Sequence, residues 1–196
     1  MPSSADAMGL LRAAIAEVAD DRRAQRKLAR AATSRAHCEM EWVYEIFGTE
    51  ALESSGAHRE ASLGGRARAD LQLGETSVEF KSAQAHFAIP EAFDGTAPLR
   101  DRADEWLGKD LRRMSACGGL FVLVVSTVQP PATSRYADSD LDELREAALA
   151  RYTTWLGTRV SETGALPLVV RLFGGAGSYA GQSAVHDLLV VRWDGS

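Results

Sequence analysis

The sequence predicts an α/β protein, and two strand patterns set among helical ones are the basis for this. Apolar and polar residues alternate along 66–84, a period typical of a β-hairpin. Leu120–Val128 is a continuous apolar run of the kind buried on both faces of a sheet. Apolar residues at helical spacing fill much of the remaining chain, and 196 residues are enough for one domain with a substantial core.

The N-terminal segment is helical from Ala5 to about Arg30, with Leu11, Ile15 and Val18 on one stripe. A charged run follows that stripe, which indicates a solvated end. We therefore divide the chain into a helical extension, residues 1–32, and a single domain, residues 33–196. The extension either packs on the domain or forms a separate arm or a dimerisation helix.

Within the domain, residues 35–128 form the expected core and residues 129–196 an elaboration of it. A helix is expected from about 33 to Gly48, because Trp42, Val43 and Ile46 recur at helical spacing. Residues 51–63 hold one strand and then a loop. The later elements are expected to be a helix at 101–116, a helix at 139–156 capped by Gly157, and strands at 166–173 and 184–193 joined by a glycine-rich loop.

Composition narrows the class of protein. The chain is 45% apolar and 25% charged, as in ordinary globular proteins, and its net charge of −5 argues against a protein that coats nucleic acid through a large basic surface. A local basic groove remains compatible with that charge. Two cysteines without metal-site spacing, no apolar run of about 18 residues and no signal-like start predict a cytoplasmic protein that does not enter a membrane.

The hairpin at 66–84 carries the chemistry. If Gly74-Glu75 is its two-residue turn, Leu71 lies opposite Val78 and Asp70 opposite Glu79. Two carboxylates then share one face, and Lys81, two residues beyond Glu79, points the same way. Because opposed like charges destabilise a hairpin, we expect a cation between them, and a divalent metal is the obvious candidate.

One helical carboxylate points toward the same region. Glu39 precedes Trp42, Val43 and Ile46 by three, four and seven residues, so it extends the apolar stripe of its helix toward the core. A carboxylate in that position needs a partner, unless it ends the helix with its side chain in solvent. Glu41 lies nearer the opposite flank and reads as a solvated charge.

A hard divalent cation suits these groups. Mg²⁺ prefers carboxylate and carbonyl oxygens and retains waters, so Asp70, Glu79 and the Phe80 carbonyl would leave room for water and a substrate phosphate. The metal would lower the pKa of bound water, while Lys81 would orient that water or stabilise the transition state. This is the chemistry of phosphodiester hydrolysis, with Mn²⁺ as a substitute for Mg²⁺.

Basic residues flank the hairpin and occupy a later helix. Arg66 and Arg68 continue the strand face of Asp70, where they could hold flanking phosphates. Lys109, Arg112 and the adjacent Arg113 are spaced to share a helix face. They would either contact phosphates or interact favourably with the helix dipole.

Asp70, an eight-residue gap and Glu79-Phe80-Lys81, behind a glutamate-bearing helix, resemble the PD-(D/E)XK nuclease superfamily. The pattern is most similar to archaeal Holliday-junction resolvases and restriction-endonuclease-like proteins. The resemblance implies a mixed sheet flanked by helices in the order αβββαβ. It also assigns metal binding to Asp70, Glu79 and Glu39, with Glu41 as the fallback, and assistance of the attacking water to Lys81.

The resemblance implies a Mg²⁺-dependent endonuclease that cuts nucleic acid, most often DNA, in restriction, repair or defence. The alternative is a nuclease-fold module that no longer cuts and works as a binding or assembly subunit. The acidic balance and the two terminal extensions motivate this alternative. Either protein would work alone, as a homodimer or with a partner subunit.

Overall fold

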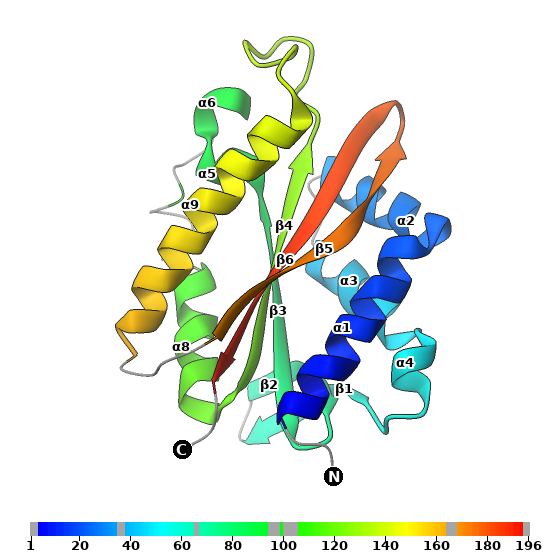
Figure 1. Cartoon of the computed structure of the whole chain (residues 1–196), viewed down its shortest axis with the longest axis vertical. Coiled ribbons are helices and arrows are strands. Elements are labelled where there is room, and N and C mark those ends of the chain that lie inside the picture. Colours follow the sequence, from blue (N-terminus) through cyan, green and yellow to red (C-terminus); the bar gives the residue numbers. More distant parts are fainter. Residues whose placement is uncertain are drawn as a thin grey trace.

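The computed structural model describes residues 4–34, 38–64, 67–93, 99, 106–163 and 168–193. A twisted sheet separates two groups of helices, as expected for an α/β protein (Figure 1). The elements are α1 (Ser4–Asp20), α2 (Arg22–Thr33), α3 (Cys38–Phe47), α4 (Glu50–Glu53), β1 (His58–Gly64), β2 (Ala67–Leu73), β3 (Thr76–Gln84), α5 (Ala85–Ala88), α6 (Pro90–Phe93), α8 (Gly108–Cys117), β4 (Gly119–Val128), α9 (Leu141–Ser161), β5 (Leu168–Tyr179) and β6 (Gln182–Trp193).

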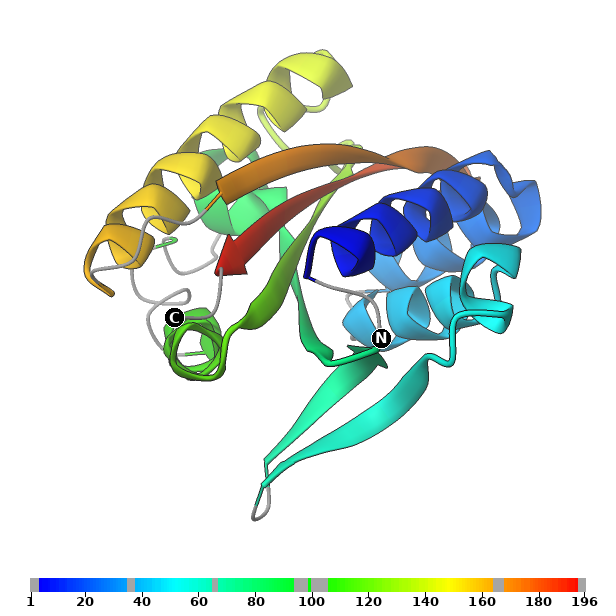
Figure 2. The same ribbon diagram turned by 60° about the horizontal axis from the view of Figure 1, so that its bottom comes forward.

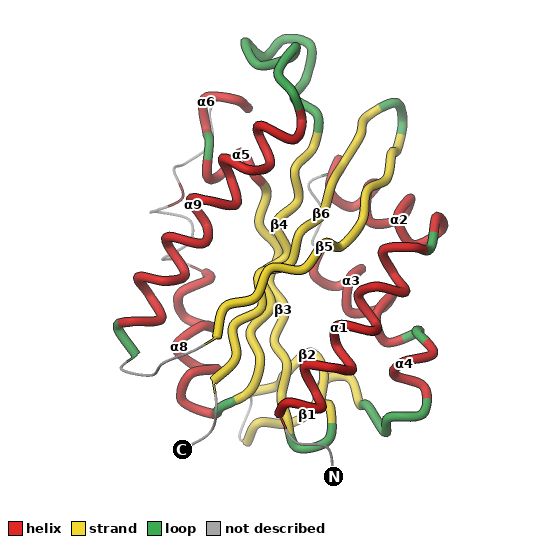
Figure 3. The backbone as a smooth tube through the Cα atoms, viewed as in Figure 1, coloured by secondary structure: helices red, strands yellow, loops and turns green. Residues whose placement is uncertain are grey.

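The sheet is mixed and six-stranded in the order β1-β2-β3-β4-β6-β5 (Figure 3). Strands β1, β2 and β3 form an antiparallel meander, β3 pairs in parallel with β4, and β6 pairs antiparallel with both β4 and β5. The parallel pair needs a crossover, which helices α5 to α8 supply. Strand β3 is therefore central, with helices on both of its faces.

Each face of the sheet is covered by its own apolar core. Helices α1 to α4 pack on one face, where Trp42 and Phe80 are fully buried, and α8 and α9 pack on the other around Phe121 and Tyr152. The predicted central strand is confirmed, since β4 is buried from Leu120 to Thr127. Alternate side chains of β3 thus face different helices, and this decides what each polar residue of the hairpin can meet.

The N-terminal segment forms two helices, whereas the sequence predicted one. Asp21 ends α1 and caps α2, because its Oδ1 accepts a hydrogen bond of 2.8 Å from the Arg23 amide. Leu11 and Ile15 of α1 and Leu28 of α2 lie in the same buried cluster as β3 and β4. Of the three alternatives for this segment, packing on the core is the one observed.

The glycine-rich segment at 174–181 is largely strand, and the predicted loop is wrong. Residues 168–179 all belong to β5 and pair with β6, apart from a register shift at Gly174, and the chain turns at Ala180-Gly181, both at positive φ. A Cβ on Gly177 would lie 2.4 Å from the carbonyl oxygen of Gln25 in α2. The glycines therefore let a helix backbone approach a strand closely.

Helix α9 continues past its predicted cap. Gly157 has open space around its Cα, and the helix extends to Ser161. A glycine inside a helix costs about 1 kcal/mol relative to alanine, which burial of Val160 in the following turn offsets.

Strands β1 and β2 project from the body of the molecule as a long hairpin (Figure 2). Strand β2 pairs with β1 along most of its length but with β3 at only three positions. Separately, none of the helices in the described ranges is long and apolar enough to cross a membrane.

Candidate active site

The candidate site lies where β2 separates from β3. The pairs Leu73–Thr76, Gln72–Ser77 and Leu71–Val78 are formed as predicted from the turn. The ladder ends there, so the predicted pairing of Asp70 with Glu79 is wrong. Strand β2 follows β1 into the projecting hairpin instead, and beyond Val78 the β2-facing edge of β3 has no strand partner among the described residues.

Two carboxylates bind the backbone amides of this edge. The Phe80 amide donates to Asp70 Oδ2 over 2.7 Å, and the Ser82 amide donates to Glu39 Oε2 over 3.1 Å. The Ser82 hydroxyl donates to the same Glu39 oxygen over 3.0 Å. A strand residue directs its N–H and C=O to the same edge, so the Phe80 carbonyl also lies on the Asp70 side of β3.

Glu79 and Lys81 alternate with these residues and meet α8. Lys81 Nζ lies 3.2 Å from Glu79 Oε1 and 3.3 Å from Asp110 Oδ2. The Arg113 guanidinium lies 2.6 Å from Glu79 Oε1 and 3.1 Å from Asp110 Oδ1. Glu79 is only 4% exposed, and its Oε2 has no hydrogen-bond partner within the described part of the chain. One of its oxygens therefore carries two ion pairs and the other none.

The four charged residues of the predicted motif are electrostatically coupled. Burial raises the pKa of Asp70, and Glu39 adds to that rise against the Phe80 amide and Lys81. Burial also raises the pKa of Glu79, with Asp70 adding to the rise. Burial alone would lower the pKa of Lys81, but Glu79, Asp110 and Glu39 together raise it. The pKa shifts therefore combine burial, as the largest cause, with interactions among neighbouring charges of both signs.

Among the described residues of this cluster, carboxylates outnumber basic side chains. When ionised, Glu39, Asp70, Glu79 and Asp110 carry four negative charges against the two positive charges of Lys81 and Arg113. The formal charge of −2 is partly removed from water, which is unfavourable unless protons or a cation neutralise it. Burial is the largest cause of the raised pKa values of Asp70 and Glu79, and the neighbouring carboxylates Glu39 and Asp70 add to it.

The donor chemistry of the cluster fits a hard divalent cation. Asp70 and Glu79 supply carboxylates, the Phe80 carbonyl faces the same edge as Asp70, and the buried Glu79 Oε2 is unpartnered among the described residues. No group of three or more His, Cys, Asp or Glu side chains in the described ranges is already arranged around one ion position. Glu39 is turned to Ser82, and Glu79 is turned to Lys81 and Arg113.

The other predicted site residues lie apart from this cluster. Arg68 is exposed on the projecting hairpin, 3.2 Å from Glu60, and Arg66 lies outside the described residues. On α8, Lys109 and Arg112 are exposed, and Arg112 lines a groove shared with Arg159 of α9. Glu41, the fallback helix residue, is partly exposed, and Glu39 is the helix carboxylate bonded to β3.

Sequence reasoning missed two members of the cluster. Asp110 and Arg113, three residues apart on α8, reach Lys81 and Glu79 across the crossover. The basic row on this helix was recognised, but the member that reaches the cluster is the partly buried Arg113, next to Met114 on the helix. The apolar stripe of α8 contains the signal, because residues that flank a buried stripe face the neighbouring strand.

The chain was compared with protein-family models, with curated proteins and with solved structures, and none of the three comparisons found a match.

Proposed function

We propose that the protein is a cytoplasmic, metal-dependent endonuclease that hydrolyses phosphodiester bonds, most naturally in DNA. One observation carries the proposal: Asp70 and Glu39 bind successive outward amides of β3 at the point where β2 departs, beside Glu79 and Lys81. Four residues of the nuclease-like motif, from three separate elements, thus meet at one edge. When the four-residue helices α4, α5 and α6 are left out, the described order α3-β1-β2-β3-α8-β4 matches the αβββαβ order of the PD-(D/E)XK core and supports the same proposal.

Each side chain has a role in this proposal. Asp70, Glu79 and the Phe80 carbonyl would hold Mg²⁺ or Mn²⁺, which would supply a bound water of lowered pKa and neutralise phosphate charge. Lys81, held by Glu79 and Asp110, keeps its proton and presents an ammonium to the scissile phosphate. Glu39 fixes Ser82 and with it the edge of β3.

In this proposal Arg113 has two positions, one paired with Glu79 and one released from it. Its guanidinium pairs with Glu79 Oε1, so release of Arg113 would make this oxygen, in addition to Oε2, available to a cation. An arginine freed in this way would be available for a substrate phosphate, which it can bind through two parallel hydrogen bonds.

Cleavage of DNA by variants tests the proposal. With Mg²⁺ present, the purified chain should convert supercoiled plasmid or labelled duplex to cut products, and Asp70→Ala and Lys81→Ala should each lower the rate by roughly 10²- to 10⁴-fold. Glu146→Gln, which changes an exposed carboxylate paired with Arg171, serves as the matched control and should cut at the wild-type rate. Circular dichroism should show the same fold in all variants. Full cleavage activity in both Asp70→Ala and Lys81→Ala would show that the proposed nuclease site is wrong.

A specific observation favours a second candidate function, a nuclease-fold module that binds without cutting. The carboxylates of the described cluster are not arranged around one ion position, and Lys81 and Arg113 already neutralise Glu79. Titration calorimetry with Mg²⁺ and Mn²⁺ separates the two candidates. Binding that is lost in Asp70→Asn supports the enzyme, whereas no measurable binding supports a subunit that works with a partner or as a homodimer.

A further inference from the structure

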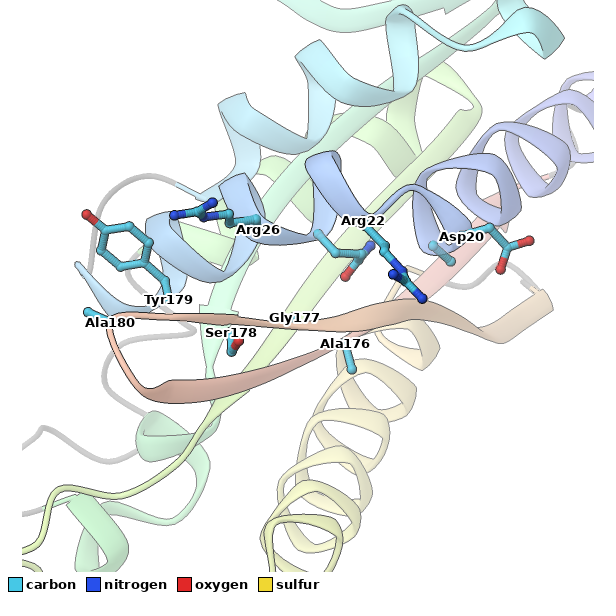
Figure 4. Close-up of a pocket in the computed structure, with 10 residues that line it drawn as sticks. Asp20, Arg22, Arg26, Ala176, Gly177, Ser178, Tyr179 and Ala180 are labelled. Carbon is cyan, nitrogen blue, oxygen red and sulfur yellow. The ribbon is translucent and has the colours of Figure 1, made fainter.

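A groove of about 510 Å³ lies between α2 and the last residues of β5 (Figure 4). Arg22 and Arg26, one helical turn apart, line its helix side, and Ala176 to Ala180 line its strand side. The close-up shows Arg22 extending across the groove toward β5, with Tyr179 at one end and Asp20 at the other. The groove is large enough for a nucleotide-sized group.

The charge along this groove is one-sided. Helix α2 carries five basic residues and no acidic one, although the whole chain has a net charge of −5. Lys27 is paired with Glu45, but Arg22 and Arg26 form no ion pair with any described residue. Arg30 continues the row after a further turn. Uncompensated arginines repeating every four residues are spaced about 6 Å apart along the helix and so present a line of cations.

The walls of the groove add two other kinds of contact. Tyr179 offers an aromatic ring, and the Arg30 guanidinium lies over it, 5.7 Å from its centre. Gln25 lines the groove and is 4% exposed, with its amide nitrogen donating to the carbonyls of Val18 and Gly174. Its Oε1 has no hydrogen-bond partner among the described residues. The side-chain nitrogen of Gln25 therefore holds α2 to β5, and its Oε1 can still accept a hydrogen bond.

We propose that this groove binds a single-stranded segment of nucleic acid. Arg22 and Arg26 contact successive phosphates, and a base lies against Tyr179, the combination of a basic track and an aromatic platform that single-strand binding uses. Asp20 repels phosphate at one end, so the strand runs from Arg22 toward Arg30. An acidic protein segment would use the arginines but not the ring, which is why nucleic acid is the favoured occupant.

The groove leads toward the candidate active site. Arg22 and Ala32 are about 15 Å apart along α2. The Ala32 carbonyl accepts a hydrogen bond of 2.9 Å from the Gln84 side chain. Gln84 lies two residues beyond Ser82 on β3. This placement extends the proposed function, since a strand held at α2 would be delivered toward the edge of β3. The binding itself does not depend on cleavage.

Fluorescence anisotropy tests the groove with a labelled 20-nucleotide single strand and the full chain in EDTA, so that metal-dependent cleavage plays no part. The double variant Arg22→Gln/Arg26→Gln should bind at least about tenfold more weakly. The slope of log affinity against log salt should also fall by about 1.4, the value for two lost phosphate contacts on a single strand. Asp20→Asn should bind more tightly than the wild type.

Arg23→Gln is the matched control, because Arg23 is exposed on the same helix but does not line the groove. Its affinity should stay within about twofold of the wild type. If the double variant binds with wild-type affinity and salt slope, or loses no more than Arg23→Gln, the groove assignment is wrong. If a duplex of equal length bound more tightly than the single strand, and Tyr179→Leu left the affinity unchanged, the assignment of a single-stranded ligand would be wrong. If the chain does not cleave DNA but Arg22→Gln/Arg26→Gln still weakens binding, only the proposed enzymatic function is contradicted.

Discussion

Two buried carboxylates of the same sheet differ in how their charge is balanced. Asp187 on β6 is 1% exposed and accepts hydrogen bonds of 2.6 and 2.8 Å from Arg145 and one of 3.2 Å from Arg171. Both of its oxygens are satisfied. Glu79 on β3 is 4% exposed, yet one of its oxygens is unpartnered among the described residues and burial raises its pKa.

This difference in charge balance distinguishes Asp187, which belongs to a structural ion pair, from Glu79, which has an oxygen that could bind a ligand. Around Asp187 the arginines match the buried charge, and the remaining charge of Arg171 is matched by Glu146 at the surface. Around Glu79 the described carboxylates outnumber the described cations by two, and burial raises the pKa of Glu79. Buried charge left unbalanced is characteristic of functional sites, where stability is given up for chemistry.

Breaking the balanced pair should have the largest effect on stability. Asp187→Ala should lower the free energy of unfolding by about 3–5 kcal/mol, because it leaves Arg145 without its partner against the sheet. Urea unfolding measures this. Glu146→Ala, which removes the exposed partner of Arg171, should cause a much smaller change. Equal losses in the two variants would contradict the view that Asp187 is held by a buried structural pair.

Binding of a cation to the cluster around Glu79 should stabilise the protein by less than the loss expected for Asp187→Ala and by more than the pH effect described below. If Mg²⁺ binds Asp70 and Glu79, a concentration one hundred times the dissociation constant should add about 2.7 kcal/mol to the free energy of unfolding. Asp70→Asn/Glu79→Gln should abolish this gain, which a thermal or urea titration with and without Mg²⁺ would detect. A gain of the same size in the double variant would place the metal elsewhere.

The smallest expected effect is a difference in pH dependence. Because the folded protein raises the pKa of Glu79, folded molecules hold a proton that unfolded ones have lost, so stability falls as pH rises from about 4.3 through the folded pKa. Glu79→Gln should flatten this fall in EDTA, because the amide side chain has no charge to bury and does not titrate. Urea unfolding from pH 4 to 8 measures it.

His186 provides an internal reference for that experiment. Burial lowers the pKa of this fully buried histidine to about 4, so it makes the protein less stable as pH falls from about 6.5 toward 4. The effect is the same in the wild type and in Glu79→Gln, and the difference between the two curves isolates Glu79. Parallel curves would show that Glu79 titrates as an ordinary carboxyl group.

Local patterns predicted much of the fold. Alternation around Gly74-Glu75 gave the register of Leu71 with Val78, and the apolar run at 120–128 gave the central strand. The helical stripe of Trp42 and Ile46 gave α3 and directed Glu39 inward, where it bonds Ser82. These features depend on periods of two or three to four residues, which the sequence displays directly.

Features that depend on contacts between distant segments were not predictable in the same way. The glycines of β5 resembled a loop because the close approach of α2 that explains them lies about 150 residues earlier in the chain. The burial of His86 beside Phe87 and the exposure of Cys117 likewise have no local sequence signal. Burial of a short element depends on what packs over it.

The sequence by itself determined the register of the β2–β3 turn and three of the residues that carry charge beside it, because alternation places Glu79 and Lys81 on one face of β3 and puts Asp70 on the preceding strand, next to Leu71. Tertiary structure alone decided how that charge is balanced. It turned β2 away, so that Asp70 binds the Phe80 amide, and it brought Asp110 and Arg113 across from α8. Backbone periodicity is a local property, whereas the neutralisation of a buried charge depends on every element packed around it.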